Sequence, residues 1–285
     1  MIFTSKPIRM IIEKTLDIIK QIYKIHKIIP PKITKVVIGL GYTGVEVSAY
    51  AYEPFLGLAS TLPGIIKATN CSKIKFAGEL TNKPLSELLS WSLKTPSLER
   101  IIGIATLNGV SQHILKIINP YKNLEGRLLE KLNINDDTKV TFIGLIKPLI
   151  KKVNKITQLI TIVEDTLPSS LEFNHLNLKK NINELEEREI FTDVLICTGS
   201  SLINNTLESI LEKYKRKARK IILIGPTASM IPDILFDYGI DIIGGMEIID
   251  PEATLQILQE GGGTKLFKKY GKKYYLVKES NDINS

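Results

Sequence analysis

The stretch Asp193-Val-Leu-Ile-Cys-Thr-Gly-Ser-Ser201 is the most informative part of the sequence about the fold. Four apolar residues in succession lead directly into a threonine, a glycine and two serines. A short, continuous apolar run is typical of a parallel strand whose two faces are both buried. Small polar residues at its end let a ligand approach the backbone closely. The stretch therefore predicts a central strand that ends at a site.

The same pattern recurs through the second half of the chain. Strand-like runs rich in valine and isoleucine lie at residues 139–145, 158–164, 193–198, 220–225 and 241–244. Helical segments are expected at residues 147–154, 204–214, 228–236 and 251–259. Strands that alternate with helices predict an α/β fold, here a Rossmann-like doubly wound parallel sheet with helices on both faces.

The first half of the chain has a different pattern. Residues 8–28 have apolar side chains at helical spacing, and Pro30-Pro31 ends this helix. Gly39-Leu-Gly-Tyr-Thr-Gly44 matches the dinucleotide-binding pattern G-x-G-x-x-G, but that pattern needs a helix behind it. Residues 45–52 instead alternate between apolar and polar as a strand does. We therefore expect the glycines to form a hairpin turn and not a cofactor loop.

Two further helices are expected before the second half begins. They cover residues 82–93 and 98–118, and the second is apolar on nearly every side, which predicts that it is buried. Asn119-Pro120 ends this region. We therefore expect an α+β domain of residues 1–119, followed by the parallel-sheet domain of residues 120–285.

The composition is that of an ordinary globular protein and argues against several kinds of site. The 285 residues are 44% hydrophobic and 24% charged. Two distant cysteines, Cys71 and Cys197, and three scattered histidines argue against a disulfide framework and a protein-only zinc site. This cysteine usage favours a reducing, cytoplasmic location. No uncharged apolar run is long enough for a membrane-spanning helix.

The charge balance is basic, with a formal net charge of +8. No signature of a nucleic-acid-binding module accompanies it, so we expect neither nucleic acid nor a membrane as a partner. Many lysines and isoleucines also occur in the proteins of some thermophiles. The expected partner is a small-molecule ligand, and the sequence leaves a homo-oligomer open.

Parallel sheets bind ligands outside the carboxyl ends of their strands, and this rule selects the candidate ligand-binding residues. They are Gly144, Thr198, Gly199, Ser200, Asn204, Thr206, Gly225, Pro226, Thr227 and Gly245. Glu164 ends the second strand-like run, where an acidic side chain commonly holds ribose hydroxyls; the alternative is a solvated strand end. The first turn carries one glycine, so NAD is weakly supported and S-adenosylmethionine fits no worse.

Two of the candidate segments have both a functional and a structural interpretation. Residues 198–201 offer hydroxyl and backbone donors to an anion, and the same groups can cap the next helix, which is worth about 1 kcal/mol. Gly261, Gly262 and Gly263, followed by Lys265, fit an anion-binding nest and also an ordinary helix C-cap.

An ordered set of motifs resembles the putative heavy-metal chelation family. The motifs are Gly103-Ile-Ala-Thr-Leu-Asn-Gly109, Phe142-Ile-Gly144, Cys197-Thr-Gly-Ser-Ser-Leu-Ile-Asn-Asn-Thr206, Leu223-Ile-Gly-Pro-Thr227, Gly244-Gly245 with Asp250, and Glu260-Gly-Gly-Gly263. The resemblance implies an enolase-N-terminal-like domain followed by a Rossmann-like domain. It also implies that Asn108 of the first domain completes a site on the edge of the sheet. Asn108-Gly109 departs from the family's more usual Asn-Ala.

The resemblance implies a role in making or handling a chelator, a pterin-like molecule or a metal. Our leading hypothesis is a protein that binds or transforms a small anionic metabolite in the cleft between the domains. Glu164 is the candidate catalytic residue, as a general base. One alternative is a non-enzymatic carrier of a metal or a metal chelate, held through Glu164, Asp165 or Asp250. The other is a methyltransferase that uses S-adenosylmethionine. A divalent metal and S-adenosylmethionine are thus the cofactors considered, and enzymatic activity is left open.

Overall fold

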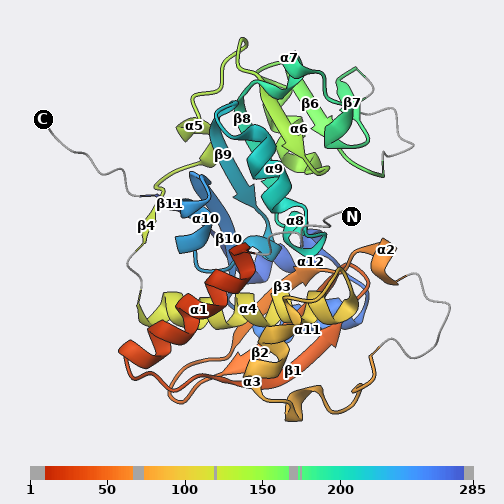
Figure 1. Cartoon of the computed structure of the whole chain (residues 1–285). Helices are drawn as coiled ribbons and strands as arrows, with labels where there is room; N and C mark the ends of the chain where they lie inside the picture. Colours follow the sequence, from red (N-terminus) through yellow and green to blue (C-terminus); the bar gives the residue numbers. More distant parts are fainter. Residues whose placement is uncertain (1–9, 67–73, 119–120, 167–172, 174, 279–285) are drawn as a thin grey trace, which may run out of the picture.

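The N-terminal elements form a small antiparallel sheet covered by helices (Figure 1). The computed structural model describes residues 10–66, 74–118, 121–166, 173 and 175–278. The first elements are α1 (Met10–Ile25), β1 (Lys32–Ile38), β2 (Tyr42–Ser48), β3 (Phe55–Ser60), α2 (Pro63–Ile66), η1 (Leu80–Asn82), α3 (Leu85–Trp91) and α4 (Leu98–Ile117). β1, β2 and β3 pair antiparallel in that order. The predicted α+β unit is confirmed, and a hairpin joins β1 to β2 as expected.

Helix α4 lies tightly against β3 and α3 because glycines stand at the contacts. A Cβ atom on Gly57 of β3 would overlap Ala105 and Gly109 of α4, and one on Gly103 would overlap the backbone of Ser92. Residues 100–114 are all buried. The prediction of a helix buried on all sides is therefore confirmed, and the small residues of this helix serve its packing.

The second half of the chain forms an eight-stranded, mostly parallel sheet. Its strands are β4 (Lys122–Asn123), β5 (Val140–Ile143), β6 (Ile160–Val163), β7 (Asn177–Lys179), β8 (Thr192–Thr198), β9 (Ala218–Ile224), β10 (Ile242–Ile248) and β11 (Gly271–Val277). The order across the sheet is β4-β11-β10-β9-β8-β5-β6-β7, with β11 antiparallel to both of its neighbours. Numbered along the chain, the six parallel strands run 3-2-1-4-5-6 from β7 to β10, which is the order of the dinucleotide-binding fold.

Helices cover both faces of this sheet, as the doubly wound prediction requires. The helices of this half are α5 (Leu128–Lys131), α6 (Lys147–Val153), α7 (Glu187–Ile190), α8 (Ser200–Ile203), α9 (Leu207–Tyr214), α10 (Asp233–Asp237), α11 (Pro251–Gln259) and α12 (Thr264–Phe267), with the 3-10 turns η3 (Ile182–Glu184), η4 (Pro226–Ala228) and η5 (Lys268–Tyr270). Ile150 of α6 packs with Phe142 in one apolar cluster. Leu211 of α9 and Leu195 of β8 belong to another, on the opposite face.

Several element boundaries differ from the prediction. The helix predicted at residues 204–214 begins only at Leu207, as α9, and the separate short helix α8 precedes it. Asn205 lies between the two helices and has a left-handed backbone with φ of 59°. The segment 228–236 ends as the short helix α10, which begins only after Pro232. β3, β4, β7 and β11 were not predicted. β7 was not recognised because it has only three residues, all half-buried. β11 was not recognised because Lys272 and Lys273 interrupt its apolar pattern.

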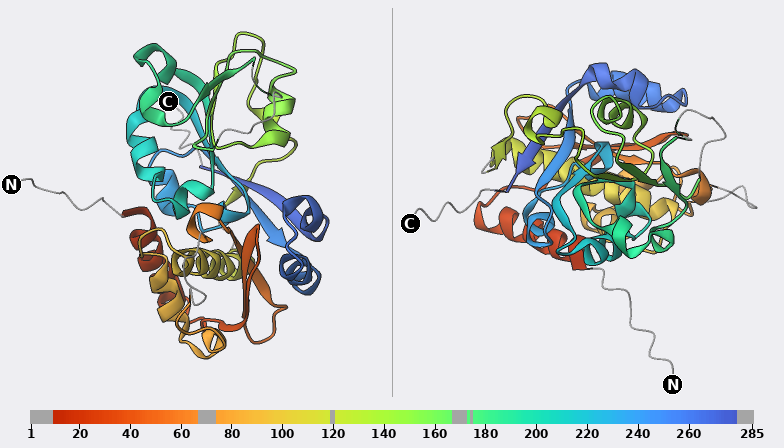
Figure 2. Two further views of the ribbon diagram at one scale, coloured as in Figure 1. Left: turned by 90° about the vertical axis from the view of Figure 1, so that its right-hand side faces the viewer. Right: turned by 90° about the horizontal axis from the view of Figure 1, so that it is seen from above.

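The two halves of the chain share one core. A single apolar cluster joins Ile11 of α1 and Ile101 of α4 to Leu195 of β8. A second cluster joins Leu56 of β3 to Leu255 of α11, so the last helices pack on the first sheet (Figure 2). The boundary predicted at Asn119-Pro120 lies outside the described residues.

Candidate functional site

The parallel strands point their carboxyl ends toward the first domain, as Figure 1 shows for β8 and β9. The strand order reverses between β5 and β8, because the chain continues from β5 outward to β6 and β7 and then returns to β8. In open α/β sheets the ligand binds outside the carboxyl ends of the strands at such a switch point. The loops after β5, β6 and β8 are therefore the candidate site.

Gly144 brings the loop after β5 close to the end of β8. Its φ of 101° is a backbone conformation that favours glycine, and a Cβ atom there would lie 2.5 Å from Cγ2 of Thr198. Gly144 and Thr198, two of the predicted residues, thus meet at the switch point.

Glu164 reaches from the end of β6 to the loop after β5. Its Oε2 accepts a hydrogen bond of 2.8 Å from the backbone N–H of Leu145, and its Oε1 accepts a long one from Thr166. Partial burial raises the pKa of Glu164, and a hydrogen bond with Asp165 raises it further. That same hydrogen bond lowers the pKa of Asp165. Of the two carboxyl groups, Glu164 is therefore the one whose environment favours the protonated form, a perturbation that is common at functional sites.

Of the residues at the end of β8, Ser201 makes a local turn contact, whereas the hydroxyl groups of Thr198 and Ser200 remain available to a ligand. Ser201 donates a hydrogen bond of 2.8 Å to the carbonyl of Thr198, which is a local turn contact. The Thr198 and Ser200 hydroxyls are 3.4 Å apart, and both residues are half-buried. Their hydroxyls have only long contacts with each other, so they retain hydrogen-bonding capacity for a ligand. Gly199 packs closely on Ala228, where a Cβ atom would lie 2.7 Å from the backbone nitrogen.

Helix α4 covers the remaining strand ends. Arg100 donates from Nε and Nη2 to the carbonyl of Leu202, at 3.1 and 2.6 Å. Gln112 donates to the carbonyl of Ser229 at 2.9 Å.

These carbonyls lie in the loops after β8 and β9, and Met246 of β10 packs with Leu56 of β3. The first domain therefore covers this part of the sheet, here called the β8–β10 edge. Thr198 and Ser200, at the end of β8 and the start of the loop after it, make no hydrogen bond to the first domain among the described residues. We call residues 144–148 and 164–166, which follow β5 and β6, the β5–β6 edge. Within the described residues, no hydrogen bond or ion pair joins this edge to the first domain.

Asn108 lies where the first domain covers the β8–β10 edge. Its Nδ2 donates to the carbonyls of Leu58 and Thr227, at 2.8 and 3.0 Å, and the residue is fully buried. Its Oδ1 has no hydrogen-bond partner among the described residues. Asn108 therefore reaches the second domain as expected. Its amide, however, forms hydrogen bonds within the domain interface and does not lie at the switch point.

Two more predicted residues, Pro226 and Thr227, also lie in this interface, and Gly225 and Gly245 are next to residues that line it. The Thr227 hydroxyl accepts a hydrogen bond of 3.0 Å from the backbone N–H of Ser60, next to buried Pro226. Gly225 turns the chain with φ of 119°. A Cβ atom on Gly245 would overlap the Tyr274 hydroxyl. Pro226 and Thr227 join the two halves, and among the described residues none of the four positions makes a hydrogen bond with Glu164.

The last predicted residues lie away from the switch point. Asn204 and Thr206 are exposed in the α8–α9 turn. Gly261 and Gly262 end α11, with their N–H groups donating to the carbonyls of Leu258 and Ile257 at 3.1 and 2.7 Å. This is the Schellman C-cap, which was one of the two interpretations. Gly263 follows them and begins α12, and the loop packs near Leu40 of the first hairpin.

Arg100 and Gln112 were missed by the sequence analysis. Both are polar residues inside a helix that is mostly apolar, and such residues must find hydrogen bonds when buried. That pattern was the available signal for an interface role. The acceptors are backbone carbonyls, which have no signature in the sequence.

Comparison with known proteins agrees with this architecture. Two sequence profiles described as putative heavy-metal chelation match residues 24–111 and 127–277. The chain belongs to the putative heavy-metal chelation family. It is 30% identical over 202 residues to an uncharacterized protein of Methanocaldococcus jannaschii, covering 70% of this chain and 73% of the relative.

Two solved structures of the family share the fold. A protein of unknown function from Pyrococcus horikoshii superposes with a TM-score of 0.69 at 22% identity, over 94% of this chain and 100% of that one. A protein from Desulfitobacterium hafniense gives a TM-score of 0.69 at 19% identity, over 93% and 100%. The two-part architecture described above is therefore the fold of this heavy-metal chelation family.

The family description raises the question of a metal centre in this chain. Among the residues that the structure describes, no three His, Cys, Asp or Glu side chains are grouped so that they could hold a metal ion. Glu164 and Asp165 lie together, and Asp250 instead caps α11 by accepting from the backbone N–H of Ala253 at 2.9 Å. Within the described residues, no helix is long and apolar enough to cross a membrane.

Proposed function

We propose that this member of the heavy-metal chelation family binds a small anionic metabolite at the β5–β6 edge, beside the first domain. The ligand belongs to the synthesis or handling of a metal chelator or a pterin-like compound. Gly144 lets the ligand approach the backbone closely. Thr198 and Ser200 donate hydrogen bonds from their hydroxyl groups, and Glu164 accepts a hydrogen bond from the ligand.

One observation carries this proposal. The Glu164 carboxyl group is partly buried, fixed by the backbone N–H of Leu145, and located where the strand order reverses. A carboxyl group with a raised pKa at such a place is typical of binding and catalytic sites. If the ligand is transformed there, Glu164 is the residue that we propose as the general base.

The donor chemistry of the described residues bears on how a metal would be bound. Glu164 and Asp165 supply only two side chains as metal ligands, fewer than protein sites for divalent cations usually use. We therefore propose that any metal arrives as a chelate, with the organic ligand providing most of the donor atoms. This is the non-enzymatic carrier form of the same function.

Native mass spectrometry with elemental analysis tests the proposal. The samples are the gently purified wild type, Glu164→Gln, and Glu187→Gln as the control, because Glu187 is an exposed acidic residue on α7. We expect a retained small molecule, with or without its metal, in the wild type and the control, and its loss from Glu164→Gln. A ligand retained equally by all three proteins contradicts the assignment of the site.

A second candidate function is methyl transfer from S-adenosylmethionine. It is favoured by the position of Glu164, at the end of the second parallel strand, where an acidic residue holds ribose hydroxyls in sheets of this order. Calorimetric titration with S-adenosylmethionine tests it. Binding to the wild type and to Glu187→Gln, lost in Glu164→Gln, supports this candidate, and no binding to folded wild type removes it.

A further inference from the structure

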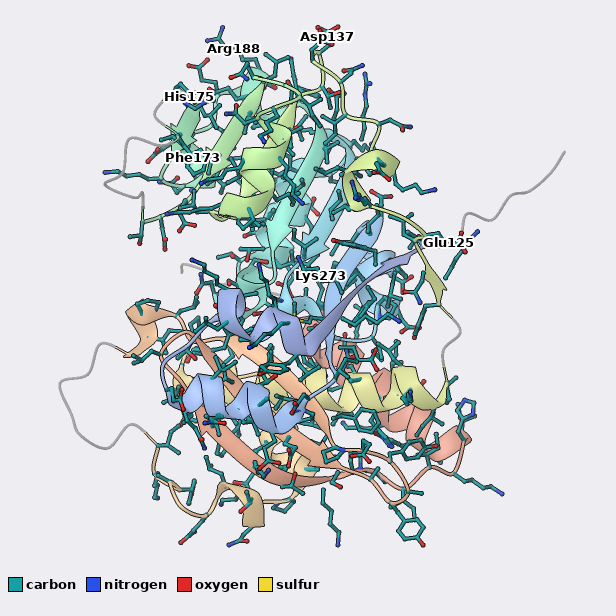
Figure 3. The ribbon with its side chains drawn as sticks, turned by 180° about the vertical axis from the view of Figure 1, so that it is seen from behind. Glu125, Asp137, Phe173, His175, Arg188 and Lys273 are labelled. Carbon is teal, nitrogen blue, oxygen red and sulfur yellow. The ribbon has the colours of Figure 1, made fainter. Side chains whose placement is uncertain are left out.

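A groove lies at the amino edge of the sheet, on the opposite side from Glu164. It has a volume of about 350 Å³ and is formed where β5, β8 and β9 begin. Its lining residues are Lys139, Phe191, Thr192, Asp193, Arg216, Lys217, Ala218 and Arg219. A neighbouring groove of about 390 Å³ shares Asp193 and Arg219 and includes Asp137, which Figure 3 labels at the end of the molecule away from the N-terminal strands. A volume of this size suits a small molecule.

The charge in the groove is strongly unbalanced. Four cationic side chains line it, against the single carboxylate of Asp193. That carboxylate is already engaged, since Oδ1 pairs with Nη1 of Arg219 at 3.1 Å and Oδ2 accepts from the Lys139 N–H at 2.9 Å. Lys139, Arg216 and Lys217 make no ion pair within the part of the chain that the structure describes. Their mutual repulsion would be relieved by a ligand with several negative charges.

The floor of the groove is held rigidly by the backbone. The carbonyl of Lys139 accepts hydrogen bonds from the N–H groups of Asp193 and Val194, at 3.0 and 3.1 Å. The Thr192 N–H donates to the carbonyl of Lys217 at 3.0 Å, which ties the start of β8 to the turn before β9. The cations therefore project from a fixed frame, and little backbone order has to be gained when a ligand binds.

An exposed aromatic ring completes the groove. Phe191 is 51% exposed, although phenylalanine is one of the residues most often buried in folded proteins. A phenyl ring beside cationic groups can stack on a flat ring while the cations bind phosphates. We propose that the amino-edge groove binds an organic polyphosphate that carries a flat ring, at a site separate from the β5–β6 edge.

Calorimetric titration with two probes tests this site, adenosine triphosphate and inorganic tripolyphosphate, both without divalent cations. The groove variant is Lys139→Gln/Lys217→Gln, and the matched control is Lys268→Gln/Lys272→Gln, which removes the same charge from exposed positions near β11. We expect the groove variant to bind both probes roughly tenfold more weakly, and the control to change affinity by less than about twofold, because exposed distant charges are screened. Equal losses in the two variants mean a general charge effect and overturn the proposal.

Phe191→Ser separates the two parts of the ligand. We expect it to weaken the binding of adenosine triphosphate and to leave tripolyphosphate unchanged. If both probes bind Phe191→Ser as they bind the wild type, the groove takes no flat ring and the proposal fails. It also fails if Glu164→Gln abolishes the binding of either probe, because the phosphate would then lie at the carboxyl edge. Failure here leaves the function proposed for the β5–β6 edge intact, since that test uses different variants.

Discussion

The two halves of the carboxyl edge have the same local chemistry but different surroundings. At the β8–β10 edge, small and polar residues such as Pro226 and Thr227 are buried under the first domain. At the β5–β6 edge, Gly144 and Glu164 have no bonds to that domain among the described residues. The strand ends alone do not decide which residues meet a ligand. The first domain also decides this, because the strand ends that it covers are buried in the interface and only the others can meet a ligand.

Helix α4 is the element that makes this difference. Arg100, Asn108 and Gln112 of this helix each donate to a carbonyl in the loops after β8 or β9. Buried donors of this kind contribute modestly when paired and cost much when removed or left alone. The interface is therefore a stability feature, whereas the β5–β6 edge is available for function.

The largest expected effect is on stability, at Arg100. Arg100→Met removes a buried guanidinium that donates to the carbonyls of Ser92, Lys94 and Leu202. Those carbonyls lose their partners, so we expect the free energy of unfolding to fall by about 3 kcal/mol. Urea denaturation followed by circular dichroism measures the change. A loss below about 1 kcal/mol would mean that the α4 interface contributes little, and the contrast between the two edges would fail.

A pair of glycine substitutions separates stability from binding. Gly245→Ala places a methyl group on the Tyr274 hydroxyl, and Gly144→Ala forces a strained φ and crowds Thr198. We expect each to cost about 1–3 kcal/mol of unfolding free energy. Only Gly144→Ala should also abolish the retention of the ligand seen by native mass spectrometry. Loss of the ligand in folded Gly245→Ala, with retention in Gly144→Ala, would reverse our assignment of the two edges.

A pair of threonine substitutions should show a smaller contrast. Thr227→Val leaves the Ser60 N–H without its acceptor in the interface, and we expect a loss of about 1–2 kcal/mol. Thr198→Val removes only long hydroxyl contacts, so we expect a change within about 0.5 kcal/mol together with weaker ligand binding. Thermal unfolding and ligand titration of both variants measure the two quantities. Comparable destabilisation by both substitutions would show that the Thr198 hydroxyl is structural.

The sequence was sufficient for the parallel sheet and for the position of Glu164 at the end of β6, but not for the division of the carboxyl edge. Continuous apolar runs such as 193–198 reflect burial on both faces, so they predict strands without any knowledge of tertiary contacts. The three-residue strand β7 has no such run to recognise. The use of Asn108 in the interface depends on which carbonyls face it after folding, and backbone carbonyls are the same in every residue. Likewise Gly261 fits a nest and a C-cap equally well until its hydrogen bonds are known.

The smallest expected effect concerns the pH dependence of stability at Glu164. Its pKa is raised in the folded protein, chiefly by burial, so folding favours the protonated form. That contribution is fully present below the unfolded pKa and is lost as pH rises through the folded pKa. Glu164→Gln imitates the protonated carboxyl group and keeps an oxygen acceptor for the Leu145 N–H.

We therefore expect Glu164→Gln to be more stable than the wild type at neutral pH, by less than about 1 kcal/mol because solvent screens a partly exposed group. The difference should shrink as pH falls toward the unfolded pKa of a glutamate, about 4.3. Urea denaturation of both proteins from acidic to neutral pH measures it, with Glu187→Gln as the control for loss of a charge. A Glu164→Gln protein that is less stable than the wild type at neutral pH would mean that the carboxylate is stabilised in the folded state. In that case Glu164 would be a structural acceptor for the loop after β5, and the distinction between a functional and a structural edge would lose its main support.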